Sequence, residues 1–108
     1  MIHFNDFLNT LKKNLGDLAK EYGSQYKDAI IKDGTDFALQ THVKLDEWLQ
    51  MVVKGQLTKD DLEYLLEGQK DLMRMETLKN TGLAIAQKDK LQRAMLETVA
   101  GSILKMVP

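Results

Sequence analysis

Two pairs of adjacent carboxylates, Asp46-Glu47 and Asp60-Asp61, are the residues of this sequence best suited by type to general acid or base chemistry. Asp60 and Asp61 follow Thr58 at the start of a helical pattern, where carboxylates cap a helix and favour its positive end. Asp46 and Glu47 belong to the exposed flank of another predicted helix. A catalytic carboxylate needs a pocket that shifts its pKa, and no feature of the sequence indicates such a pocket. We therefore expect no enzyme and no catalytic residue.

Metal and cofactor motifs are equally scarce. His42 and Asp46 stand four residues apart, a spacing that two metal ligands on one helix face could use. A site needs further ligands, and the only other histidine is His3 near the N-terminus, so we interpret His42 as a histidine at the edge of the core. The sequence has no cysteine, no glycine-rich phosphate loop, no nucleophile elbow and no metalloprotease motif. We expect no bound metal, no cofactor and no small-molecule substrate.

The charges are balanced overall but unevenly distributed. The formal net charge is −1, and the basic stretch from Lys70 to Arg93 contains no aromatic residue that could stack on a base. We therefore do not expect nucleic acid as a partner. Residues 1–69 carry 12 acidic and 8 basic side chains, whereas residues 70–108 carry 4 acidic and 7 basic ones. The acidic first part and the basic last part could attract each other, within a chain or between chains. Alternatively, these charged side chains simply lie on outer helix faces in contact with water.

Helices must position all of these residues. The only proline is Pro108, and strand-like alternation of apolar and polar residues is rare. Of the 108 residues, 44% are apolar, which suits one soluble domain with a core. We predict a single all-α domain over residues 1–108, a small bundle of three to four helices. No apolar run has the length of a signal peptide or a transmembrane helix, so we expect a cytoplasmic protein.

The first predicted helix covers Asn5 to about Tyr22 and carries one apolar seam at alternating spacings of four and three residues. The seam consists of Phe4, Leu8, Leu11, Leu15, Leu18 and Tyr22. The helix could end at Gly23 or continue to Lys32 with a shift of register, and we favour the continuous helix.

The second helix follows the segment Lys32–Phe37, where Gly34 suits a helix end and Thr35 or Asp36 can cap the next helix. It runs to about Lys54 and stops at Gly55. One face carries an apolar stripe: Ala38, His42, Leu45, Trp48, Leu49 and Val52. Val43 and Met51 lie away from that stripe, so this helix could contact partners on more than one side.

The third helix begins at Thr58, which forms a predicted capping box with Asp61 and is flanked by the hydrophobic staple pair Leu57 and Leu62. It could continue to Lys105 as one long C-terminal helix or break near residues 80–82, and we favour continuity. Four polar residues would then interrupt its buried stripe, namely Gln69, Glu76, Asn80 and Gln87. If the chain turns instead, these residues simply face water.

The last segment, Ala94–Val107, is apolar on most sides, as expected of a helix that is buried or inserted. Together with the first seam it exceeds what one small bundle needs to bury. We therefore predict a non-enzymatic interaction or assembly module that acts as a homo-oligomer or binds another helical protein. The predicted interface consists of the six seam residues with Trp48, Met95, Val99, Ile103 and Met106. The alternative is a protein that acts at a membrane surface through its apolar C-terminal helix.

Overall fold

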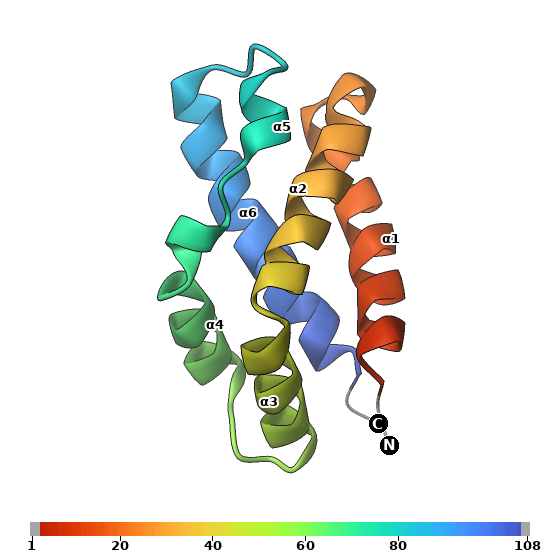
Figure 1. Cartoon of the computed structure of the whole chain (residues 1–108), viewed down its shortest axis with the longest axis vertical. Coiled ribbons are helices and arrows are strands. Elements are labelled where there is room, and N and C mark those ends of the chain that lie inside the picture. Colours follow the sequence, from red (N-terminus) through yellow and green to blue (C-terminus); the bar gives the residue numbers. More distant parts are fainter. Residues whose placement is uncertain (1–2, 107–108) are drawn as a thin grey trace.

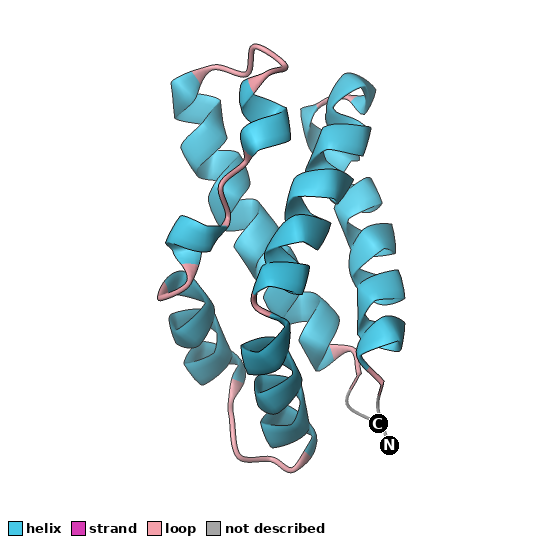
Figure 2. Cartoon of the chain, in the orientation of Figure 1, coloured by secondary structure: helices cyan, strands magenta, loops and turns pink. Residues whose placement is uncertain are grey.

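Helices account for most of residues 3–106, the part of the chain that the computed structural model describes, and this part contains no strand (Figures 1 and 2). In chain order they are α1 (Phe4–Tyr22), the short 3-10 helix η1 (Ser24–Tyr26), α2 (Lys27–Gln40), α3 (His42–Val53), α4 (Lys59–Glu67), the 3-10 helix η2 (Lys70–Leu72), α5 (Glu76–Lys79) and α6 (Ile85–Leu104). The predicted small all-α bundle is confirmed.

The helices enclose one hydrophobic core. α1 and α2 form an antiparallel pair, and α6 crosses behind them and packs on α1 and α4 (Figure 1). α3 continues below α2, and the short α5 packs against α2. Every α-helix contributes at least one buried apolar side chain to a single cluster. The chain therefore buries its main apolar faces against one another.

The first helix ends at Tyr22, so the favoured continuation to Lys32 is wrong. Gly23 adopts φ +125°, a backbone conformation that residues with a side chain rarely reach. Its N–H still donates to the Ala19 carbonyl at 2.9 Å, which closes the last turn of α1. The chain then reverses through η1 into α2.

The predicted helix end at Lys32–Phe37 is also wrong, because α2 passes straight through Gly34. An ideal Cβ at position 34 would lie only 2.5 Å from Cδ1 of Leu15 on α1. Gly34 is therefore required by a close approach of two helices and not by a turn. The actual break lies at Thr41, and Gly55, with φ +76°, follows the end of α3 as predicted.

α4 begins as predicted. The Thr58 hydroxyl accepts the Asp61 N–H at 3.1 Å, and the Asp61 carboxylate accepts the Thr58 N–H at 3.1 Å. The favoured single helix to Lys105 is wrong, because α4 ends at Glu67 and α6 begins only at Ile85. The break near residues 80–82 is real, and Gly82 there has φ +81°.

The segment between α4 and α6 is tied to the core by side chains from other helices. The buried Asp33 accepts the N–H groups of Thr77 and Leu78, at 3.1 and 2.8 Å. From α6, the Gln92 amide donates to the Met73 carbonyl at 2.8 Å. Met75, which lies between these two contacts, is buried, and its backbone adopts the left-handed conformation with φ 56°.

The polar residues that are predicted to interrupt one buried stripe do not share a helix, since Gln69 and Asn80 lie in turns, Glu76 in α5 and Gln87 in α6. Glu76, Asn80 and Gln87 are exposed, and Gln69 is partly buried. The three exposed residues therefore face water, and no register-fixing role follows from the four.

Candidate interaction surface

The predicted interface residues of α1 lie largely within the chain's own core. Leu11 and Leu15 are fully buried, and Phe7 and Ala19 join them although neither belongs to the predicted seam. The other seam residues are partly buried and pack at the edge of the core, namely Phe4, Leu8, Leu18 and Tyr22. The buried face is thus rotated from the predicted seam toward Phe7 and Ala19.

The C-terminal part of the predicted interface lies on and just after α6, which packs on α1 and α4. Met95, Val99 and Ile103 are buried, Trp48 is nearly so, and Met106 is partly buried. Two polar contacts fasten the same contact region, since the Asn14 amide donates to the Ser102 hydroxyl at 2.9 Å and Lys105 donates to Asn14 at 3.3 Å. The two apolar segments therefore meet each other inside one chain. Assembly through the predicted interface residues stays a prediction. Those that are buried in the core expose little surface that a second copy of the chain could contact.

Open hollows flank α6, but their linings are mixed in charge. One of about 330 Å³ lies between α4 and α6, where Glu63, Glu67 and Glu97 surround Arg93. Another of about 600 Å³ lies beside Tyr22 at the end of α1. Burial and the nearby carboxylates of Glu21 and Glu97 raise the pKa of the Tyr22 phenol above its ordinary value of 10.0. The carboxylates that line these two hollows are exposed or only partly buried.

A third hollow, of about 390 Å³, lies between α3 and α4 and includes Lys44, Trp48 and Tyr64 in its lining. Trp48 contributes little surface to this lining, since its side chain is almost entirely buried in the core. Lys44 and Glu67 give its rim opposite charges. The hollow therefore presents no single charge to a ligand.

Large apolar side chains that are left uncovered mark the outer surface more clearly. Within residues 3–106 the exposed ones are Leu39 at 52%, Val43 at 82%, Tyr64 at 80% and Ile85 at 82%. Leu39 and Val43 are four residues apart, on either side of the junction between α2 and α3. They form what we call the α2–α3 face, together with the carboxylates of Asp36, Asp46 and Glu47.

Thr41 creates this junction. Its hydroxyl donates to the Phe37 carbonyl at 2.8 Å, and its N–H donates to the same oxygen at 3.0 Å. A threonine that bonds back to the preceding turn bends a helix. α3 nevertheless begins at once, because the Leu45 N–H donates to the Thr41 carbonyl at 2.8 Å. The bend lets α2 and α3 cover the core in succession while sharing one outer face.

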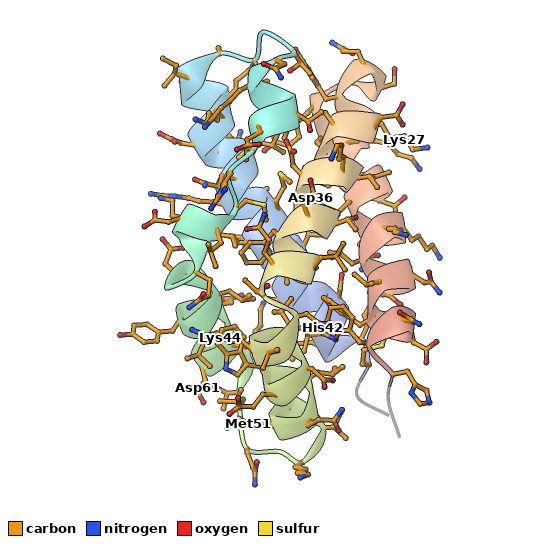
Figure 3. The ribbon with its side chains drawn as sticks, in the orientation of Figure 1. Lys27, Asp36, His42, Lys44, Met51 and Asp61 are labelled. Atoms are coloured by element: carbon orange, nitrogen blue, oxygen red, sulfur yellow. The ribbon has the colours of Figure 1, made fainter. Side chains whose placement is uncertain are left out.

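The orientation of α3 explains why Val43 is uncovered. The His42 ring stacks on the Phe4 ring of α1 with centroids 3.8 Å apart, and Figure 3 shows His42 on the side toward α1. Lys44 lies on the other side, toward α4 (Figure 3). Because a helix has 3.6 residues per turn, Val43, which lies between His42 and Lys44 in the sequence, points away from the core. Of the two residues predicted to lie off the stripe, Val43 is exposed and Met51 is partly buried.

The α2–α3 face is framed by carboxylates. Asp36 binds Lys32 at 3.1 Å, and this hydrogen bond, with the charge of Asp36, raises the pKa of the Lys32 ammonium. Asp46 and Glu47 make no ion pair within the described chain. A partner that covers Leu39 and Val43 therefore meets negative charge at the same time.

Sequence patterns indicated only part of this face. Val43 stood out because it breaks the apolar stripe, but Leu39 did not, because its exposure depends on the bend at Thr41.

Residues 3–106 contain no group of three or more histidine and carboxylate side chains placed to hold a metal. In the same range, no helix is both long and apolar enough to cross a bilayer. Comparisons with protein-family models, curated proteins and solved structures return no match.

Proposed function

We propose that this chain is a non-enzymatic helical module that works by protein–protein contact, and that it assembles with copies of itself through the α2–α3 face. The observation that carries this proposal is the uncovered pair Leu39 and Val43 on a single outer face. Single exposed apolar residues are ordinary, but a pair at helical spacing gives a partner helix a continuous contact line. Action in the cytoplasm remains the expectation from the sequence.

Burial of this pair supports association without any change in the fold. Removing a valine side chain fully from water contributes roughly 1.5–3 kcal/mol, and Val43 is still mostly exposed in the single chain. Most apolar residues in the C-terminal half of α6, on which a membrane role would depend, already belong to the core, and α6 packs on α1 and α4. The assembly role therefore uses surface that the fold leaves free.

Light scattering on a sizing column, over a range of protein concentrations, tests this proposal. The expected result is a species heavier than the 12.3 kDa chain at the higher concentrations. Val43→Lys should shift this species toward the single-chain mass, because an exposed helix position tolerates lysine while the apolar contact is lost. Tyr64→Ser, which removes an equally exposed apolar side chain from α4, is the matched control and should leave the mass unchanged. A mass of one chain at every concentration would overturn the proposal.

A further inference from the structure

A second uncovered apolar surface lies where α6 begins. Ile85 is 82% exposed, its neighbours Ala84 and Ala86 are exposed, and Leu83 is partly buried. This run follows Gly82, which turns the chain from α5 into α6. We call residues 79–90 the α5–α6 corner. Leu83 packs against the edge of the core, whereas Ala84, Ile85 and Ala86 lie outside the core cluster, so these three residues leave the corner available for contact.

The α2–α3 face and the α5–α6 corner carry opposite charge. Residues 36–47 contain three carboxylates and one lysine, a balance of −2 that becomes −1 when Lys32, the ion-pair partner of Asp36, is counted. Residues 79–90 contain three lysines and one carboxylate, a balance of +2. In each surface a charged residue lies one helical turn from the exposed apolar residue. Glu47 follows Val43 by four positions on α3, and Lys88 follows Ile85 by three on α6. The two surfaces are therefore complementary in both charge and apolar character.

One chain cannot bring these surfaces together. Figure 1 shows the turn between α5 and α6 at the upper end of the molecule, and the junction of α2 and α3 below its middle. The two are held apart by the packing of α2, α5 and α6 in one core. A second copy of the chain has no such restriction, because its corner is free to approach the face of the first.

We infer that the α2–α3 face of one copy binds the α5–α6 corner of another, with Val43 against Ile85 and Glu47 beside Lys88. This inference rests on the proposed function and specifies its contact as one between two different surfaces of the same chain. Such a contact uses the acidic first part and the basic last part of the sequence together. Its charged rim makes association weaken as salt is added.

A charge-reversal cycle tests the inference. Glu47→Lys and Lys88→Glu should each weaken self-association by about 3- to 30-fold, because each replaces an attractive pair by a repulsive one. The double variant, which carries both substitutions in the same chain, should restore most of the wild-type affinity, since the pair is then present with its signs exchanged. Circular dichroism and thermal unfolding at low concentration check that all variants fold. The matched control is the double reversal of Lys12→Glu on α1 with Glu67→Lys on α4, for which no change is expected.

The outcomes separate the two proposals. If the wild-type chain associates but both single reversals behave like the control, or the double variant fails to recover, the inferred contact is wrong while self-association stands. If the wild-type chain has the mass of one chain at every concentration, the proposed function itself fails. The inference is supported if the double variant recovers the affinity of self-association and if adding Val43→Lys to it removes that affinity again. This result identifies the α2–α3 face and the α5–α6 corner as the contacting surfaces.

Discussion

The carboxylate of Asp33, in the middle of α2, accepts the backbone N–H of Leu78 at 2.8 Å across 45 residues of sequence. Its other oxygen accepts the N–H of Thr77 at 3.1 Å, so one side chain caps the start of α5 from a different helix. The free N–H groups at the start of a helix need acceptors, and none of the residues just before α5 supplies a side-chain cap. Asp33 thereby fixes the chain that leads into the α5–α6 corner.

Asp33→Asn should therefore destabilise the fold by about 1–3 kcal/mol, since a neutral amide offers one acceptor where the carboxylate offers two, and hydrogen bonds to a charged group are the stronger ones. Urea unfolding followed by circular dichroism measures the loss. Asp17→Asn, at an exposed carboxylate of α1 that contacts only Lys20 at 3.5 Å, is the control and should change stability by less than about 0.5 kcal/mol. Equal effects of the two substitutions would contradict the capping role of Asp33.

Gly34 and Gly101 provide a second test, because both are glycines within helices but only one faces a close neighbour. Gly34→Ala should cost about 1–3 kcal/mol of overpacking against the fully buried Leu15, offset in part by about 1 kcal/mol of helix propensity. Gly101→Ala should stabilise the fold by about 0.5–1 kcal/mol, since beyond its chain neighbours and the backbone of its own helix no atom lies within 4 Å of the added Cβ. Denaturant unfolding of both variants checks the opposite signs. A gain in both would mean that α1 and α2 do not approach as closely as the structure places them.

Gly34 also shows why the helix boundaries were only partly predictable. Local patterns were sufficient where the cause is local: the capping box of Thr58 and Asp61 and the stop at Gly55 are read from neighbouring residues. Gly34 carries the same local signal for a helix end, yet it continues α2, because its function is to admit Leu15 from another helix. The break at Thr41 has no glycine or proline to mark it.

The candidate surface was predictable to a similar degree. Apolar periodicity placed Leu11, Leu15, Val99 and Ile103 on buried faces, but it could not say that these faces pair with each other within one chain. An apolar stripe looks the same whether a neighbouring helix or a second copy covers it. The exposed residues Leu39 and Ile85 depend on the bend at Thr41 and on the turn at Gly82, so only Val43 could be singled out in advance.

Tyr22 gives a prediction in alkaline solution. Its raised pKa means that the folded chain holds the phenolic proton more tightly than the unfolded chain does. The stability that comes from neutral Tyr22 is therefore complete below pH 10.0, the ordinary pKa, and is lost as the pH rises through the folded value. Absorbance titration of the phenolates should show a step above pH 10.0 that Tyr22→Phe removes and Tyr64→Phe leaves in place. Glu97→Gln should move this step toward lower pH without restoring the ordinary value, because burial is the largest cause of the shift and the carboxylate charges add to it. A step that survives Tyr22→Phe would contradict the raised pKa of Tyr22, and a step that Glu97→Gln leaves in place would show that α6 does not bring Glu97 to the end of α1.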